Sequence, residues 1–286
     1  IPRGSGSNKM LVVSWISSVF GNMVSALFIL NNKFDLIFVF GPSPFTICLP
    51  AIFIKKIKNI PICFWVLDLW PESVVSAGNL KSGLIPRLLI PVVKFIYKYC
   101  DRILVSSRGF IDSIVEKGIS PNKIGFFPQW AEPIFKPDKK NNEYFDNKIS
   151  ENSFKIMFAG NIGEAQDFPA ILHAAKILKH NKNIHWIIIG NGRMAGWVKN
   201  KIVEYELQDC FHMLGRHSIN KMPKFYSQAN AMLISLKKDD IFSITIPAKL
   251  QSYLACAKPI IAMIDGTTAQ LVRDAKAGLT CESGNA

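Results

Sequence analysis

The stretch KIMFAGNIGEAQDFPAILHAAKILKHNKNIHWIIIGNG, residues 155–192, decides the fold. Two apolar runs, at 155–161 and 185–192, each end in a glycine turn, and a helical pattern over 167–180 separates them. Short apolar runs that alternate with helices are typical of a parallel sheet covered on both faces. We therefore predict an α/β fold here, with the glycine turns at one edge of the sheet.

The same alternation continues on both sides of this stretch. Further strand candidates are FDLIFVFG (34–41), PICFWVLD (61–68), RILVSS (102–107), KIGFFP (123–128), CFHMLGR (210–216), AMLISL (231–236) and PIIAMI (259–264). Residues 136–153 interrupt the pattern, because they are polar, charged and rich in asparagine. We therefore predict two Rossmann-like domains that face a cleft, residues 1–135 and 154–286, joined by a linker over 136–153.

Three details of these domains are also predictable. The first domain has only about four strand candidates, so we expect it to be incomplete. Its helical stretch at 86–100 is expected to break near Pro91. The last residues, GLTCESGNA, are expected to end in a turn without a closing helix.

The bulk composition narrows the class of partner. The 286 residues include 34 basic and 21 acidic side chains, for a net charge of +13 that both halves share. Such a diffuse charge suits anionic ligands or an anionic membrane face. Nucleic-acid binding is the competing interpretation, but no nucleic-acid motif occurs, so we expect no such partner. The six cysteines are scattered, which indicates reduced cytosolic thiols and no zinc site.

One segment has the length of a membrane span. Residues 11–30, LVVSWISSVFGNMVSALFIL, carry no charge over 20 positions. Their serines, asparagine and glycine favour a buried or membrane-facing amphipathic helix over a crossing helix.

The first candidate ligand site is the turn FAGNIG, residues 158–163. Gly160, Asn161 and Gly163 follow a strand directly, and glycines there let backbone N–H groups approach a phosphate closely. An ordinary strand-to-helix turn explains the pattern equally well. Gln166 and Asp167 follow as polar lining, or as an N-cap of the next helix.

Two further strand ends carry weaker signals. IIIGNGR (187–193) lacks the third glycine of a dinucleotide fingerprint, since Ala195 stands at that position, so a tight turn explains it better. In LGRH (214–217), Arg216 can bind a phosphate or lie beside a base, although a surface arginine is the plain alternative. His217 has no neighbouring carboxylate and is expected to be a bystander.

The stretch PAKLQSYLACAKPIIA, residues 247–262, places a lysine at the start of a short helix. Pro247 sets the turn before the helix, and the ammonium of Lys249 can reach a diphosphate. Ser252 shares the helix face of Lys249, whereas Leu250 and Tyr253 are expected to pack. The alternative is a capped amphipathic helix with a solvated lysine.

In the first domain, the unusual segment is FWVLDLWPES, residues 64–73. Asp68 and Glu72 can orient a sugar hydroxyl or act as a base. Trp70 can stack on a sugar face or fill the core. Ser43, in the turn GPSP, opens onto the same edge of the sheet.

Taken in order, the motifs DLWPES, FPQWAEPIF, FAGNIGEAQDF, IIIGNGR, LGRH, IPAKLQSYLACAKPII and DAKAGL resemble those of glycosyltransferase family 4, which has the GT-B fold. The resemblance is to the branch that builds bacterial O-antigen, capsule and other surface polysaccharides. It implies a retaining transferase that takes a UDP-linked sugar, such as an N-acetylated one, without a metal or other cofactor. The acceptor it implies is a lipid-linked sugar or a glycan, at the inner face of the cytoplasmic membrane.

The resemblance also implies roles for individual residues. Those implied to bind the donor are Gly160, Asn161, Gly163, Gln166, Arg216, Pro247, Lys249 and Ser252. Those implied to be catalytic are Asp68, Glu72 and Lys249, and those implied on the acceptor side are Ser43, Asp68 and Trp70.

The chain departs from this family at three positions. Many members carry two glutamates eight positions apart, where this chain has Ile244 and Ser252, and a histidine where it has Leu67. Two alternatives therefore stay open. One is a nucleotide-sugar 2-epimerase, and the other is a truncated nucleotide-binding protein without transferase activity.

Overall fold

The computed structural model describes residues 17, 19–24, 32–41, 43–76, 84–138, 149–150 and 152–286. The chain divides into two compact units, residues 1–128 and 129–286. The uncharged segment 11–30 and the predicted linker lie largely outside the described residues.

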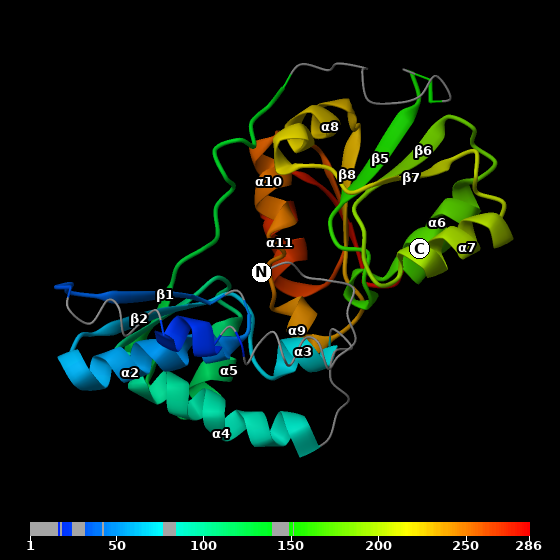
Figure 1. Cartoon of the computed structure of the whole chain (residues 1–286). Coiled ribbons are helices and arrows are strands. Elements are labelled where there is room, and N and C mark those ends of the chain that lie inside the picture. Colours follow the sequence, from blue (N-terminus) through cyan, green and yellow to red (C-terminus); the bar gives the residue numbers. More distant parts are fainter. Residues whose placement is uncertain are drawn as a thin grey trace. The chain divides into compact units, whose positions relative to one another are not determined.

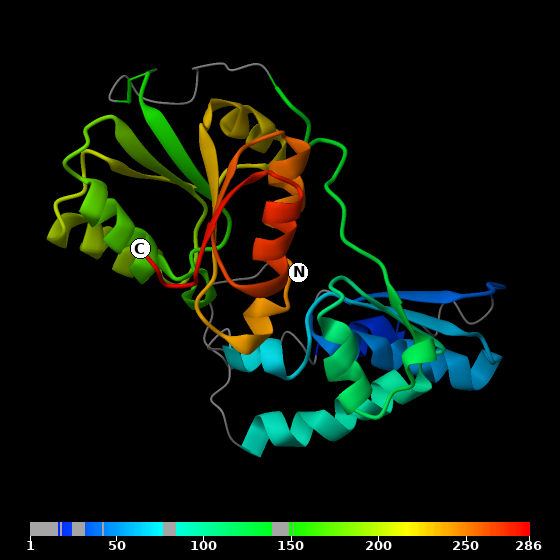
Figure 2. The same ribbon diagram turned by 180° about the vertical axis from the view of Figure 1, so that it is seen from behind.

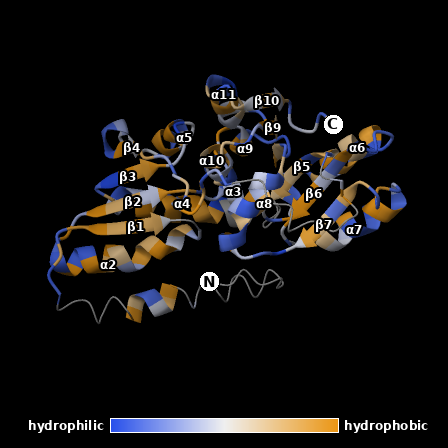
Figure 3. Ribbon diagram, turned by 90° about the horizontal axis from the view of Figure 1, so that it is seen from above, coloured by the Kyte–Doolittle hydropathy of each residue, from blue (hydrophilic) through white to orange (hydrophobic). Residues whose placement is uncertain are grey.

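The first unit is built on a parallel sheet of four strands in the order β1-β2-β3-β4. The strands are β1 (Ile37–Gly41), β2 (Ile62–Val66), β3 (Arg102–Val105) and β4 (Ile124–Phe126). The helices between them are α2 (Leu49–Lys58), α3 (Glu72–Ser76), α4 (Leu84–Tyr99) and α5 (Phe110–Glu116), with short 3-10 turns at Phe45–Cys48 and Pro121–Lys123. In Figure 1, α2 and α4 lie on one side of β1 and β2. The hydropathy colouring of Figure 3 marks these two strands as mostly apolar, as the sequence predicts.

Helix α4 continues through Pro91, so the predicted break there is wrong. A proline inside a helix removes one N–H donor and leaves the carbonyl four residues earlier without its partner. Pro91 and Arg87 are both exposed, so water can satisfy that carbonyl. The buried side chains of Val93, Ile96 and Tyr97 hold the rest of α4 against the core.

The second unit contains a parallel sheet of six strands in the order β10-β9-β8-β5-β6-β7. The strands are β5 (Phe154–Ala159), β6 (Ile184–Ile189), β7 (Phe211–Gly215), β8 (Ala231–Ser235), β9 (Ile260–Met263) and β10 (Gly278–Cys281). The helices are α6 (Phe168–Leu178), α7 (Ala195–Glu204), α8 (Met222–Gln228), α9 (Asp240–Ser243), α10 (Lys249–Ala255) and α11 (Gly266–Asp274), with 3-10 turns at Glu164–Gln166 and Ile219–Lys221. Helices α6 and α7 lie on one face of this sheet, and α8, α10 and α11 lie on the other (Figures 1 and 2).

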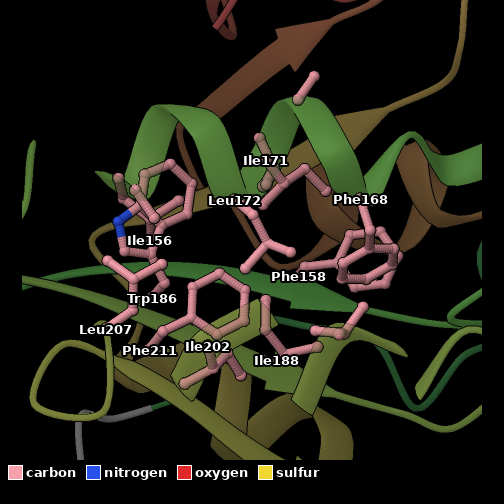
Figure 4. Packing of buried hydrophobic residues seen from close by; sticks show 14 of the residues in the cluster. Ile156, Phe158, Phe168, Ile171, Leu172, Trp186, Ile188, Ile202, Leu207 and Phe211 are labelled. Atoms are coloured by element: carbon pink, nitrogen blue, oxygen red, sulfur yellow. The ribbon is translucent and has the colours of Figure 1, made fainter. Parts of the chain in front are cut away.

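The core between α6, α7 and the sheet explains why the strand residues are continuous apolar runs. Phe158 and Phe168 meet edge to face with ring centroids 5.2 Å apart, and Trp186 and Ile188 belong to the same buried cluster (Figure 4). Each such side chain contributes roughly 1.5–3 kcal/mol on burial. This core fixes the carboxyl ends of β5 and β6, where the candidate site begins.

The sequence predicts a terminal turn where the structure has strand β10. It is only four residues long, begins with Gly278, and leaves Leu279 77% exposed. These features remove the apolar signal by which a buried parallel strand is recognised.

Candidate functional site

The order of the six strands places a crevice beside β5. From β5 the chain moves outward to β6 and β7, and it then returns to the other side of β5 to form β8, β9 and β10. Ligands of open parallel sheets bind at the carboxyl ends of the strands where the order reverses in this way. In this unit the reversal lies between β5 and β8, so the turns that follow those strands form the candidate site.

The turns after β5 and β6 pack with their backbones in contact. A Cβ atom on Gly190 would lie 1.8 Å from the carbonyl oxygen of Gly160, and one on Gly192 would lie 2.2 Å from that of Ile162. The N–H of Gly160 donates to Ile189 O at 2.9 Å, and the N–H of Ile162 donates to Asn191 O at 2.9 Å. The glycines of IIIGNGR therefore serve this close approach, as the tight-turn interpretation expects.

The predicted donor residues of the first turn are hydrogen-bonded to one another. Gly163 N–H donates to Gln166 Oε1 at 3.2 Å, and Asn161 Nδ2 donates to the same oxygen at 3.4 Å. The amides of Gly160 and Gly163, predicted to face a phosphate, thus have partners within the protein. Gln166 is half-buried, so a rotation of its side chain would free the Gly163 N–H for a ligand. Asp167 takes the N-cap position of α6 without a side-chain capping bond.

Lys249 brings a positive charge to this turn. Its Nζ lies 4.0 Å from the ring centroid of Phe158, and a Cβ on Gly160 would be 3.3 Å from it. Burial lowers the pKa of Lys249 from 10.5 to about 7. No carboxylate pairs with its ammonium in the parts of the chain that the structure describes. A partly buried cation without a counter-ion is stabilised when an anion binds, so this lysine marks an anion site.

Two of the predicted neighbours of Lys249 support the first turn of α10. The carbonyl oxygen of Pro247 accepts from Leu250 N–H at 3.0 Å, as expected for a turn that precedes a helix. Ser252 is buried, and its Oγ donates to Lys249 O at 2.9 Å. Its hydroxyl is therefore held within the protein, and its contact with a ribose stays a prediction. Helix α10 has seven residues, so the anion site depends on the lysine more than on the helix terminus.

Arg216 lies on the same carboxyl edge of the sheet, one strand beyond β6. It follows Gly215 at the end of β7, and Gly215 O accepts from Gly190 N–H at 2.8 Å, which ties its turn to the turn after β6. Arg216 is exposed and can reach a ligand at this edge. His217 bonds Leu214 O at 3.1 Å through Nε2 and packs on Phe225, so its role is structural.

A hollow that the sequence did not predict lies beyond the end of β8. Lys238, Asp239, Asp240, Ser243 and Asp265 line this hollow, which has a volume of about 490 Å³. The N–H of Lys237 donates to Ala165 O at 2.9 Å, which connects this segment to the turn after β5. Carboxylates and hydroxyls at a strand edge are suited to bind the hydroxyls of a polar ligand. The charge run KKDD directly after a strand was the available signal.

In the first unit, the predicted residues divide between edge and core. Ser43 follows β1 and Asp68 follows β2, so both lie at the carboxyl edge of that sheet, and both are half-buried. Trp70 is only 2% exposed, and its ring packs on Phe45 at 5.1 Å. Trp70 therefore fills the core, which is one of the two interpretations of this residue, and its place on the acceptor side stays a prediction.

Glu72 is engaged in an ion pair. Its carboxylate accepts from Nζ of the buried Lys117, which also donates to Ser113 Oγ at 2.9 Å. The carboxylate of Glu72 thus has a partner within its own unit. The catalytic roles of Asp68 and Glu72 stay predictions.

The ranges that the structure describes contain no group of three or more histidine, cysteine, aspartate or glutamate residues placed to hold a metal ion. No helix within those ranges is both long and apolar enough to cross a bilayer.

Comparison with known proteins identifies relatives of this chain. A family model described as glycosyl transferases group 1 matches residues 139–286. The chain is 28% identical over 209 residues to the probable glycosyltransferase WbjE of Pseudomonas aeruginosa, covering 70% of this chain and 51% of that protein. It is 22% identical over 228 residues to the putative colanic acid biosynthesis glycosyl transferase WcaI of Escherichia coli K12, covering 76% and 54%. The chain thus spans about half the length of these relatives.

Solved structures resemble the fold. HepE of Anabaena, in complex with UDP-glucose, superposes with a TM-score of 0.69 at 12% identity, covering 92% of this chain and 68% of that one. A glycosyltransferase of Rickettsia africae ESF-5 gives 0.68 at 14% identity, covering 94% and 68%. The GT-B architecture of two Rossmann-like domains predicted from the sequence is thereby confirmed.

Proposed function

Because the chain belongs to the glycosyl transferases group 1 family, we propose that it transfers a sugar from a nucleotide-diphospho-sugar to an acceptor during synthesis of a bacterial surface polysaccharide. The observation that carries the proposal is the unpaired, partly buried Lys249 at Gly160, at the strand-order reversal of the second unit. A leaving diphosphate needs a positive charge at such a place.

In the proposed reaction, the bond between the sugar's anomeric carbon and the diphosphate oxygen breaks, and its electron pair leaves on the diphosphate. Lys249 and Arg216 stabilise the charge that develops there. A hydroxyl oxygen of the acceptor forms the new bond, and its proton passes to a base, for which Asp68 is our candidate. We propose that the transfer retains the anomeric configuration and uses no metal, as the family resemblance implies. Proton NMR of the product and assays with a chelator test these two points.

We propose that the donor is a UDP-sugar, such as an N-acetylhexosamine. The fold relatives solved with UDP and UDP-glucose support a uridine nucleotide. The hollow lined by Asp240, Ser243 and Asp265 supports binding of sugar hydroxyls close to the diphosphate. Titration calorimetry with UDP, then with UDP-glucose and UDP-N-acetylglucosamine, tests the donor. Equal affinity for UDP and the corresponding CDP, GDP and TDP would argue against a uridine nucleotide.

The alternative of a nucleotide-sugar 2-epimerase is disfavoured by the family match, which is to transferases. A nucleotide-binding protein without transfer stays distinguishable by experiment. Incubation with a radiolabelled UDP-sugar and a membrane lipid extract should give a labelled lipid or glycan product. Nucleotide binding without any product would favour the binding protein.

We further propose that the first unit docks on the inner face of the cytoplasmic membrane, where a lipid-linked acceptor would lie. The outer side of α4 supports this. Leu88, Val92 and Phe95 are exposed on it, although the opposite side is buried. The exposed charges of α4 are the basic Arg87, Lys94 and Lys98, and its sequence contains no acidic residue. Apolar side chains flanked by basic ones are typical of helices that bind anionic membrane surfaces.

Vesicle sedimentation tests this docking. We expect the chain to sediment with phosphatidylglycerol vesicles and not with phosphatidylcholine vesicles. Leu88→Glu should abolish that binding, because it places a charge in the apolar stripe. Val203→Glu is the matched control, since Val203 in α7 and Leu88 are both 62% exposed. Equal sedimentation of both variants would refute the assignment of α4.

A further inference from the structure

The two central strands of the second unit separate before β5 ends. Strand β5 pairs with β8 only through Ile156 with Ala231 and Met157 with Met232. In a parallel sheet, the backbone groups of successive residues point alternately to the two neighbouring strands. Gly160 N–H donates to Ile189 O of β6, so the N–H and C=O of Ala159 point to the β8 side. At that level no residue of β8 is paired with β5.

The phenol of Tyr253 occupies this gap in the ladder. Its hydroxyl accepts a hydrogen bond from Ala159 N–H at 3.1 Å and is 3.2 Å from Ala159 O, to which it donates. Tyr253 is fully buried. One side chain of α10 thereby satisfies both backbone groups that β8 leaves unpaired, groups that are costly to bury without a partner.

This contact joins the two parts of the proposed diphosphate site. Ala159 directly precedes Gly160, and Tyr253 lies one turn after Lys249 on α10. The ammonium of Lys249 lies against Phe158 and Gly160, so its placement depends on how α10 sits on the end of β5. The hydrogen bonds of the Tyr253 hydroxyl to Ala159 join a side chain of α10 to the end of β5, and they thereby fix the position of α10 on that strand.

Aromatic neighbours hold the ring of Tyr253 in turn. The ring of Tyr226 meets it edge to face at 5.3 Å, and Phe135 stacks on Tyr226 at 5.8 Å. The phenol of Tyr253 is therefore enclosed by packed rings and has one orientation in which to meet Ala159.

We propose that Tyr253 is a positioning residue of the donor site, whose hydroxyl replaces a missing strand partner and so holds the Lys249 ammonium over the Gly160 turn. The proposal rests on the proposed function for the meaning of the site. The placement of the lysine is a separate physical claim that can be measured without any ligand.

The test compares Tyr253→Phe with Tyr205→Phe, which removes a phenol hydroxyl of the same unit outside the site. Tyr253→Phe keeps the ring and removes only the bonds to Ala159. We expect it to weaken UDP binding about tenfold by calorimetry, the factor that corresponds to roughly 1.4 kcal/mol. We expect Tyr205→Phe to bind UDP like the unchanged protein.

The readout that a merely structural role would not move is the titration of Lys249, followed by NMR with 13C-labelled lysine. Burial alone lowers the pKa of Lys249 to about 7, and no charged group contributes to that shift. In Tyr253→Phe, α10 loosens from β5 and water reaches the ammonium, so the titration should move towards the usual lysine range. Tyr205→Phe should leave it in place.

The outcomes separate the two claims. An unchanged Lys249 titration in a folded Tyr253→Phe protein overturns the positioning role, whatever UDP does. A shifted titration in a chain that never binds UDP supports the positioning role and overturns the proposed donor. If Tyr253→Phe fails to fold, 4-fluorophenylalanine at position 253 fills the space of the hydroxyl with a fluorine that cannot donate a hydrogen bond to Ala159 O. An unmoved Lys249 titration in that protein overturns the proposal equally.

Discussion

Replacement of Lys249 by methionine should make the second unit more stable at neutral pH and at the same time remove its affinity for nucleotide diphosphates. The ammonium is desolvated between Phe158 and Gly160 and has no counter-ion among the described residues. Methionine is unbranched, of similar length and apolar, so it can keep the contact with the Phe158 ring. The charge is thus maintained at the expense of stability, which is a known property of binding sites.

The magnitude follows from the pKa of Lys249. Between pH 7 and 10.5, the unfolded chain binds a proton at this residue that the folded chain does not, so stability rises with pH in that range. Below pH 7 both states are protonated, and the full destabilisation is present. Each pKa unit corresponds to 1.36 kcal/mol, which sets a ceiling of about 5 kcal/mol. The favourable contact of the cation with the Phe158 ring returns about 1 kcal/mol of this.

Hydrogen exchange of the β5 amides measures the free energy that is needed to open this unit. At pH 7, Lys249→Met should raise it by about 2–4 kcal/mol. The difference in stability between the variant and the unchanged protein should shrink as the pH rises towards 10. Calorimetry at pH 8 should show uptake of nearly one proton when UDP binds to the unchanged protein, and no binding to the variant. A variant that is less stable at pH 7 and still binds UDP would refute the reasoning.

Three further substitutions should each change stability or affinity in a stated direction. Gly190→Ala should prevent folding of the second unit or lower its stability by more than about 3 kcal/mol in thermal unfolding, because the new Cβ would meet a carbonyl oxygen at 1.8 Å. Gly196→Ala is the control: it lies in a helix with open space around it, and it should raise the stability by about 0.5–1 kcal/mol. Equal effects of the two substitutions would contradict the packing of the two turns. Gln166→Ala should tighten UDP binding severalfold, because it frees a backbone N–H of the turn, and weaker binding would indicate instead that Gln166 itself holds the donor. Lys117→Met should destabilise by about 1–3 kcal/mol in urea unfolding, because it leaves the carboxylate of Glu72 unpaired, and adding Glu72→Gln should restore most of that loss if the ion pair is the cause.

Much of the fold follows from local sequence, because buried parallel strands are unbroken apolar runs. The predicted runs end two residues beyond β5 and three residues beyond β6, because each run includes part of the glycine turn that follows the strand. Strand β10 was not predictable because it is short and exposed. The break predicted at Pro91 is wrong because the carbonyl that loses its helical partner there is exposed to water. Both errors concern exposure to water, which a local pattern does not record.

The candidate site was predictable at the level of strand ends and not at the level of contacts. Gly160, Arg216 and Lys249 follow from the rule that ligands bind at the carboxyl ends of parallel strands. Tyr253 was expected only to pack, since its hydroxyl bonds to a residue 94 positions away in the sequence. Trp70 could equally be a ligand or a core residue, and only its burial decides for the core.

The most direct test of the central claim is a crystal structure of the chain with UDP. We predict the terminal phosphate of UDP within ion-pair distance of Lys249 Nζ, above the Gly160 turn and at the point where β5 and β8 separate. UDP bound elsewhere on the second unit, with Lys249 still lying unpaired on Phe158, would contradict it.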